Sequence, residues 1–239
     1  IANLSPSADL LIDLSHYPEV AGDGVIYYEV LALTPASLTA GRFLTAARPD
    51  LDRRLMLSIT TFRREAQVEN TARRLARYLD GCDFAGQIQA LIVDNGHSAN
   101  IPAHPRIRMI RNENLGGAGG FTRGLIEGEA QGFSHVLFMD DDASIPMEAL
   151  HRTYAFLSLA KDPRAAVAGS MITTTARWRM AENGAVFDRG CRPLHAGTDL
   201  RERAPVFAME WESARKTPDK TYAGWWYFAF PVSQVQHYP

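Results

Sequence analysis

The sequence has few cysteines, no long apolar run and no excess of charge of either sign. Its two cysteines, Cys82 and Cys191, are too few and too far apart for a disulfide scaffold or a zinc motif. No apolar run approaches the roughly 18 residues of a membrane-spanning helix, and no signal peptide is recognisable. The 25 basic and 27 acidic residues nearly balance, so the chain lacks the net positive charge that would attract a nucleic acid. We therefore expect a cytoplasmic protein, with peripheral attachment to the inner face of the plasma membrane and homo-oligomerisation left open.

The glycine-rich stretch Asn114–Gly120 matches neither of two common nucleotide-binding motifs. It fails the GxGxxG pattern because Thr122 stands where the last glycine is required, and it lacks the Gly-Lys-Ser/Thr ending of a P-loop. Glycines still allow a close backbone approach, and a helix that starts near Ala118 would direct free N–H groups at an anion. Arg123 on that helix could bind a phosphate or steady an aspartate. The alternative is a glycine-rich turn that serves packing alone.

Three consecutive carboxylates, Asp140, Asp141 and Asp142, follow the apolar segment Val136–Met139. Ionised carboxylates at close range repel one another, so such a cluster favours a hard cation. Mg²⁺ or Mn²⁺ suits oxygen ligands, and Mg²⁺ usually takes one or two carboxylates together with substrate phosphates. Because side chains alternate along a strand, we expect Asp140 and Asp142 to share a side and to contact metal and diphosphate. The alternative is a solvated acidic turn.

Apolar patterning divides the chain near residue 50. Before that point, Leu10–Leu14 and Val25–Leu33 have the composition of strands, and Gly22–Gly24 has that of a turn. We expect a small β-rich, sandwich-like module over residues 1–50. Over residues 51–239, short apolar runs alternate with helical periodicity, which predicts an α/β fold with a mainly parallel, Rossmann-like sheet and flanking helices.

The elements of the α/β part are predicted one by one from the same patterns. Buried strands are expected over Leu55–Thr60, Ile88–Val93, Ile107–Ile110, Val136–Met139 and Val167–Ile172. Helices are expected to end near Gly81 and to begin near Ala118 and Met147. Residues 174–220 have an irregular, polar pattern that predicts no regular element.

The glycine and aspartate motifs together resemble a known family. Asn112-Glu-Asn-Leu-Gly-Gly-Ala-Gly-Gly-Phe-Thr-Arg-Gly124 and Phe138-Met-Asp-Asp-Asp142 are similar to motifs of the inverting, GT-A-type family 2 glycosyltransferases. Within them the chain looks most like the galactofuranosyltransferases that build bacterial galactan from UDP-galactofuranose. The resemblance spans about residues 55 to 230, and the paired motifs are much more specific than either alone. It implies a GT-A fold, a UDP-sugar donor, a glycan or glycolipid acceptor, Mn²⁺ or Mg²⁺, and an N-terminal β domain.

The resemblance also implies which residues bind the nucleotide-sugar. It places the first strand's exit loop around the base and diphosphate, and Asp94 and Asn95 on uracil or ribose. Polar side chains at strand ends can form the few directed hydrogen bonds that a nucleotide needs, although Asp94-Asn-Gly96 is also composed like a turn. The complete expected set is Thr60, Phe62, Arg63, Asp94, Asn95, Asn114, Gly117, Arg123 and Asp141.

Two adjacent tryptophans, Trp225 and Trp226, lie within the aromatic stretch Tyr222–Phe230. In extended backbone they would point to opposite sides, so we expect at most one in the core and the other at a cleft. Indole rings stack on the C–H faces of sugars, and the resembled galactofuranosyltransferases have a tryptophan pair at this place in their acceptor site. Acceptor binding by this pair is therefore implied, with core packing as the alternative.

No catalytic base is assigned from the sequence. An inverting transferase needs a general base to deprotonate the acceptor hydroxyl. In the resembled family this base is an aspartate that would lie beyond Pro239, so we expect the transferase domain to continue there. The alternatives left open are another family 2 transferase, such as a rhamnosyltransferase using a dTDP-sugar, and a non-catalytic nucleotide- or glycan-binding fragment.

Overall fold

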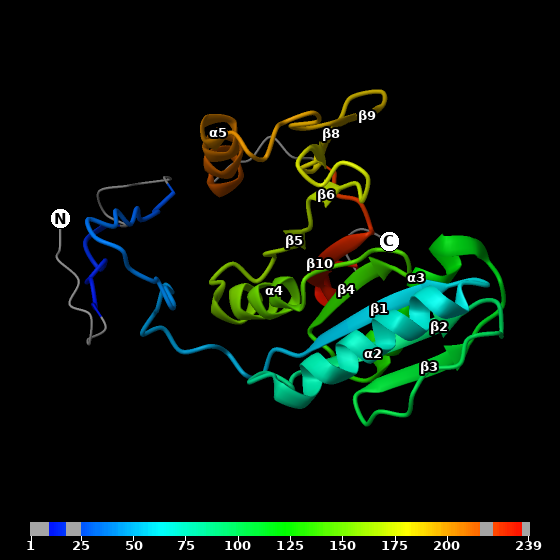
Figure 1. Cartoon of the computed structure of the whole chain (residues 1–239). Helices are drawn as coiled ribbons and strands as arrows, with labels where there is room; N and C mark the ends of the chain where they lie inside the picture. The colour runs from blue at the N-terminus through cyan, green and yellow to red at the C-terminus, as the bar shows by residue number, and fades with distance from the viewer. Residues whose placement is uncertain (1–9, 18–24, 216–221, 236–239) are drawn as a thin grey trace. The chain divides into compact units, whose positions relative to one another are not determined.

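The computed structural model describes residues 10–17, 25–215 and 222–235 (Figure 1). The chain divides into two compact units. The first, which we call the sheet unit, is built from Leu44–Ser170 and the segment from Tyr222 on. The second, which we call the hairpin unit, is built from the segment up to Phe43 and the segment Met171–Thr221. Each unit is described by itself.

The sheet unit contains a six-stranded sheet with strand order β3-β2-β1-β4-β10-β5. Its strands are β1 (Leu55–Thr61), β2 (Ile88–Asp94), β3 (Ile107–Arg111), β4 (His135–Asp140), β5 (Val167–Ala168) and β10 (Tyr227–Pro231). Strands β3, β2, β1 and β4 are parallel, and β10 runs antiparallel to both β4 and β5. The predicted α/β class with a mainly parallel sheet is confirmed.

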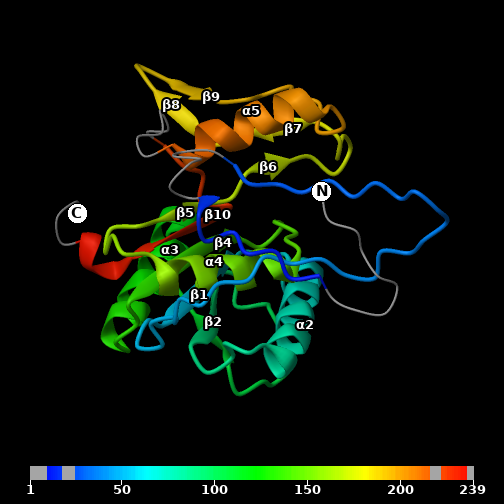
Figure 2. The same cartoon turned by 90° about the vertical axis from the view of Figure 1, so that its left-hand side faces the viewer.

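Helices cover both faces of this sheet: α2 (Glu65–Gly81), α3 (Gly116–Ala130) and α4 (Met147–Leu159). Figure 2 shows α2 and α3 on opposite sides of β1 and β2. Side-chain alternation along β1 sends Leu55, Leu57 and Ile59 into the core shared with α2 and α4, and Met56 into the core shared with Phe121 of α3. This burial on both faces explains why the parallel strands read as continuous apolar runs. None of the helices in the described ranges is long and apolar enough to cross a bilayer.

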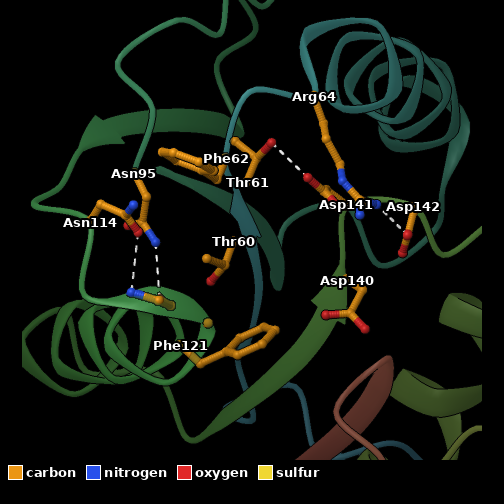
Figure 3. Close-up of a pocket in the computed structure, with 12 residues that line it drawn as sticks. Thr60, Thr61, Phe62, Arg64, Asn95, Asn114, Phe121, Asp140, Asp141 and Asp142 are labelled. Carbon is orange, nitrogen blue, oxygen red and sulfur yellow. Dashed lines mark hydrogen bonds and ion pairs between the residues drawn. The ribbon is translucent and has the colours of Figure 1, made fainter.

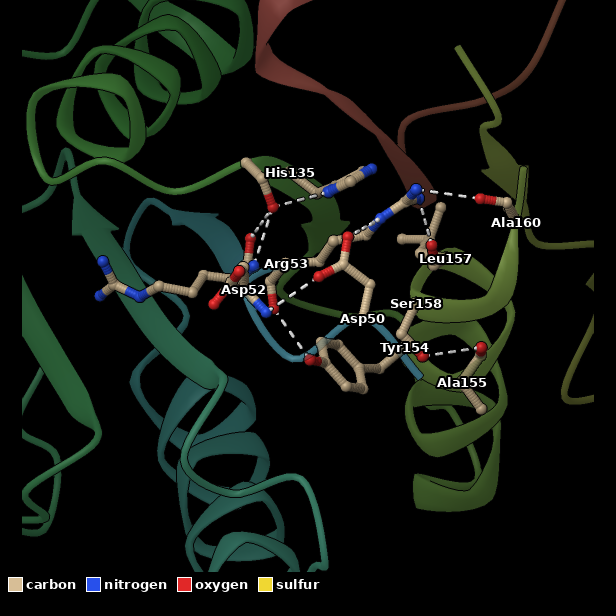
Figure 4. Close-up of polar contacts among 11 residues, drawn as sticks. Asp50, Asp52, Arg53, His135, Tyr154, Ala155, Leu157, Ser158 and Ala160 are labelled. Carbon is tan, nitrogen blue, oxygen red and sulfur yellow. Dashed lines mark hydrogen bonds and ion pairs between the residues drawn. The ribbon is translucent and has the colours of Figure 1, made fainter. Parts of the chain in front are cut away.

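The segment before β1 is tied to the last turn of α4 (Figure 4). Arg53 donates hydrogen bonds from its guanidinium to the backbone carbonyls of Leu157 and Ala160, the latter at 2.9 Å. The Tyr154 hydroxyl donates in return to the Arg53 carbonyl at 2.8 Å. A cation at a helix C-terminus satisfies carbonyls that lack partners in the helix, so these contacts fix the start of the sheet against α4.

The hairpin unit contains short strands and one helix. They are β6 (Met171–Ile172), β7 (Met180–Glu182), β8 (Ala185–Phe187), β9 (Cys191–Pro193) and α5 (Arg203–Ala214). Strand β6 pairs with β7 and β8 pairs with β9, both antiparallel. The prediction that residues 174–220 contain no regular element is therefore wrong. Sequence periodicity could not reveal α5, because Met209 is its one buried residue.

Three strand predictions fail, one in the chain that follows α4 and two in the segment before residue 44. The strand expected over Val167–Ile172 is broken at Gly169, and its halves join different sheets. The strands expected over Leu10–Leu14 and Val25–Leu33 do not form, since the described residues between 10 and 50 contain no strand. A strand needs a partner for its backbone groups, and none of the described strands pairs with these segments. A module boundary at residue 50 stays a prediction.

Candidate functional site

A cavity of about 420 Å³ opens in the sheet unit at the carboxyl ends of β1, β2 and β4 (Figure 3). The strand order reverses between β1 and β4, because β2 and β3 continue on one side of β1 and β4 lies on the other. Such a switch point leaves a crevice in which open α/β sheets bind ligands. The residues that line it are Thr60, Thr61, Phe62, Arg64, Asn95, Asn114, Gly116, Gly117, Phe121, Asp140, Asp141 and Asp142.

Glycines at four-residue spacing bring α3 unusually close to β1. A Cβ atom added at Gly120 would lie 2.2 Å from Thr60 Cγ2, and one added at Gly124 would lie 1.8 Å from Ser58 Oγ. Thr60 and Ser58 are therefore covered by helix backbone. The same close approach places Gly116, where α3 begins, at the rim of the cavity. The helix starts two residues earlier than predicted, and its free N–H groups lie where an anion could bind.

An asparagine network holds the glycine turn against the end of β2. Asn112 donates its side-chain amide to Asn95 Oδ1 at 2.9 Å, and Asn95 donates to the Gly116 carbonyl at 3.1 Å. The Gly116 N–H donates to Asn114 Oδ1 at 3.2 Å. Asn95 is buried and fixed at both ends of its amide, whereas Asn114 sits in the exposed part of the turn. Asn95 and Asn114, both predicted to bind the nucleotide, line the cavity together with Phe62, which is 42% exposed.

The three aspartates diverge because β4 ends at Asp140 and the chain then turns. Strand alternation therefore does not determine which side Asp142 faces. Asp141 is buried and accepts a hydrogen bond from the Thr61 hydroxyl at 2.8 Å. Arg64 lies 3.4 Å from Asp141 Oδ1 and also forms an ion pair with Asp142. All three carboxylates line the cavity, with Asp140 on the side away from Arg64 (Figure 3).

The electrostatics of the cluster are unfavourable for three ionised carboxylates. Partial burial, followed by the charges of Asp142 and Asp141, raises the pKa of Asp140. Burial also raises the pKa of Asp141, against the opposing effects of the Thr61 hydrogen bond and the Arg64 charge. One guanidinium thus faces three carboxylates, and additional positive charge in the cavity would stabilise their ionised forms.

The donor set at the cavity suits a cation that is shared with a bound phosphate group. Among the residues that the structure describes, no group of three or more His, Cys, Asp or Glu side chains converges to hold a metal ion. Mg²⁺ seldom needs such a cage, since it commonly binds one or two carboxylates and completes its shell with water and substrate phosphates. Asp140 and Asp142 fit that arrangement, because both are accessible from the cavity.

Asp140→Asn is expected to stabilise the cation-free protein more at neutral pH than at acid pH. The raised pKa of Asp140 contributes stability that is full below the ordinary value of 3.8 and is lost as the pH rises through the folded-state value. Asparagine stays neutral and escapes that loss. Urea unfolding in EDTA at about pH 4 and about pH 7 measures the effect. A stability difference between variant and wild type that does not change with pH would contradict this expectation.

Three of the predicted nucleotide-binding residues are not among those that line the cavity. Asp94 is buried, and its carboxylate accepts the backbone N–H groups of Gly96 and Ala99, both at 2.9 Å, so it shapes its own loop. Arg123 pairs with Glu127 one turn along α3. Arg63 has a left-handed φ of 54°, and its guanidinium lies 5.1 Å from the Phe62 ring centroid.

Four lining residues were missed by the sequence reasoning: Thr61, Arg64, Gly116 and Phe121. Thr61 and Arg64 flank two predicted residues of the same exit loop. Arg64 rather than Arg63 faces the cavity because the backbone at Arg63 has a left-handed conformation. No sequence pattern predicts that conformation. Phe121 belongs to the motif that resembles family 2 glycosyltransferases, but no binding role was assigned to it.

The two tryptophans occupy different environments. Trp226 packs against the core and donates its indole N–H to the Gly169 carbonyl at 2.9 Å. Trp225 is 45% exposed and contacts Phe121 and Phe138, with ring centroids 5.6 Å and 5.1 Å away. Trp225 thus packs against Phe121, which lines the cavity, without being one of the lining residues itself. Acceptor binding by this pair stays a prediction.

The chain was compared with protein-family models, solved structures and known sequences. No protein-family model matches the chain. A mannosyltransferase from Pyrobaculum calidifontis, PcManGT, solved with GDP-Man and Mn²⁺, matches 52% of this chain and 37% of its own at 18% identity, with a TM-score of 0.36. In sequence, the chain is 26% identical over 179 residues to galactofuranosyltransferase GlfT2 of Mycobacterium tuberculosis, a match that covers 70% of this chain. The chain spans only 27% of the length of that relative. The resemblance to galactofuranosyltransferases is confirmed, and the chain is a distant homologue of GlfT2.

Proposed function

We propose that the chain carries the donor-binding core of a metal-dependent, inverting glycosyltransferase that transfers galactofuranose from UDP-galactofuranose to a growing cell-surface glycan. One observation carries the proposal: a single cavity has the N-terminus of α3, with Gly116 and Gly117, on one side and three carboxylates on the other. A nucleoside diphosphate fits between them, because the helix terminus favours its negative charge and a cation can link it to the carboxylates. The similarity to a galactofuranosyltransferase supports the choice of sugar.

Each side of the cavity has a distinct task in this proposal. Asp140 and Asp142 hold Mn²⁺ or Mg²⁺, which when bound neutralises charge on the departing diphosphate. The first turn of α3 donates backbone N–H groups to the phosphate oxygens. Phe62 offers an exposed ring to the base, and Asn95 and Asn114 offer amide groups at the same end of the cavity. Their fixed positions reduce the ordering that donor binding requires.

Acceptor binding is proposed at the aromatic side of the cavity. The exposed face of Trp225 suits the C–H face of a sugar, whereas Trp226 is held in place by its hydrogen bond to Gly169. We assign the general base to none of the described residues. The aspartates at the cavity are engaged with Thr61 and Arg64 or proposed as metal ligands, so they are poorly suited to accept a proton from an acceptor hydroxyl.

A donor panel tests the proposal. The chain is incubated with Mn²⁺, a galactofuranose oligosaccharide and, separately, UDP-galactofuranose, dTDP-rhamnose and GDP-mannose, and diphosphate release and product mass are measured. We expect UDP-galactofuranose to be consumed in preference to the other two donors. Preferential use of another donor would overturn the sugar assignment. Binding of UDP without turnover of any donor would instead support a nucleotide-binding role without catalysis by this chain.

A further inference from the structure

Arg64 supplies the positive charge that faces the aspartate cluster. It is the N-cap residue of α2, and its guanidinium reaches across the cavity to Asp141 and Asp142 (Figure 3). The two aspartates differ in what else they contact. Asp141 also accepts a hydrogen bond from the Thr61 hydroxyl at 2.8 Å, whereas the Asp142 side chain is 56% exposed. Arg64 therefore bridges one anchored carboxylate and one accessible carboxylate.

The contacts of Arg64 compete directly with a cation for the same oxygens. Its Nη1 atom approaches Asp141 Oδ1 and Asp142 Oδ2, the carboxylate oxygens that the Thr61 hydroxyl leaves available. A divalent ion at Asp142 would lie close to the guanidinium, and the two positive charges would repel each other. The Arg64 side chain is 46% exposed, and ion pairs at such exposure are weak, so displacement is feasible.

We propose that Arg64 is a tethered counter-ion: it neutralises Asp141 and Asp142 when no divalent cation is bound, and it moves to the donor diphosphate when cation and donor bind together. The inference rests on the proposed function, because it requires a diphosphate in the cavity. The planar guanidinium suits both partners, since it pairs with carboxylates and phosphates in the same forked geometry. Arg64 therefore opposes binding of the cation alone and favours binding of cation and donor together.

This role makes the binding of Mn²⁺ and UDP cooperative. Mn²⁺ alone must displace Arg64 without offering it another anion, whereas UDP supplies phosphate oxygens that accept it. Binding linkage is reciprocal, so UDP must raise the affinity for Mn²⁺ by the same factor by which Mn²⁺ raises the affinity for UDP. Removing the Arg64 charge should raise Mn²⁺ affinity in the absence of UDP and reduce this coupling.

The test measures free Mn²⁺ by electron paramagnetic resonance during titration of the full chain, with and without UDP. We expect Arg64→Gln to bind Mn²⁺ alone about tenfold more tightly than wild type, the effect of losing two weak ion pairs. We also expect UDP to enhance Mn²⁺ binding less in this variant than in wild type. The matched control is Arg73→Gln, which removes the same charge from an exposed ion pair with Glu69 on α2 and should change neither quantity.

Each outcome bears on a separate claim. Wild-type Mn²⁺ affinity in Arg64→Gln would overturn the counter-ion role. Tighter Mn²⁺ binding with unchanged coupling to UDP would overturn the transfer to the diphosphate. Failure of wild type to bind UDP at any Mn²⁺ concentration would overturn the proposed function, while the titration without UDP still decides whether Arg64 competes with the cation. Arg64→Met removes the same charge and carries the comparison if Arg64→Gln does not fold.

Discussion

Gly124→Ala is expected to lower the free energy of unfolding by about 1–3 kcal/mol, the usual range for an overpacked core. The new methyl group would lie 1.8 Å from Ser58 Oγ and 2.8 Å from Ser58 Cβ. Ser58 is fully buried in β1, so α3 must move away from the sheet. Because the first turn of α3 lines the cavity, the same variant should also weaken UDP binding. Urea unfolding measures the loss of stability.

Gly117→Ala is the matched control for that variant. A Cβ atom at Gly117 meets no other atom within 4 Å, and its φ lies outside the left-handed range. Alanine there should be neutral or stabilise the protein by about 0.5–1 kcal/mol, since it restricts the unfolded chain. In Gly124→Ala, the further change Ser58→Ala should recover part of the loss, because it removes the closest contact and a buried hydroxyl without a hydrogen-bond partner. Equal losses at Gly117 and Gly124 would contradict close packing as the cause.

The double variant Asp140→Ala/Asp142→Ala is expected to reduce Mn²⁺-dependent UDP affinity by about a hundredfold or more. Loss of groups that only orient metal ligands costs about ten- to a hundredfold, and here the proposed ligands themselves are removed. Asp141 remains but is engaged with Thr61 and Arg64, so it cannot fully replace them. Equilibrium dialysis of labelled UDP at fixed Mn²⁺ measures the change.

The control for the double variant removes the same two charges from exposed positions. Asp52→Ala/Asp188→Ala has the same net charge, and neither aspartate lines the cavity. It should bind UDP as wild type does. A similar loss in both double variants would show that net charge, rather than metal coordination at the cavity, governs UDP binding.

The sheet and the position of the site follow from the sequence because their signals are local. Continuous apolar runs locate β1, β2 and β4 to within one or two residues, since both faces of these strands are buried. Side chains that follow parallel strands meet at one edge of the sheet, and Asn95 and the three aspartates accordingly line the same cavity. The glycine-rich stretch was recognised, but the close contact of Gly124 with Ser58 is visible only with the sheet in place.

The remaining features depend on tertiary geometry that a single sequence does not encode locally. Arg64 faces the aspartates rather than Arg63 because the backbone turns at Arg63. Asp94 resembles a ligand-binding aspartate in sequence, yet both of its carboxylate oxygens accept hydrogen bonds from backbone N–H groups of its own loop. The nearly continuous apolar run Val25–Leu33 has the composition of a strand, but no partner strand pairs with it among the described residues.

The central claim is that the cavity holds a UDP-linked donor through a divalent cation. Calorimetric titration of the wild-type chain with UDP, once with Mn²⁺ and once in EDTA, tests it most directly. We predict saturable binding with Mn²⁺ that weakens strongly in EDTA. Absence of UDP binding under both conditions, or equal affinity in both, would contradict the claim.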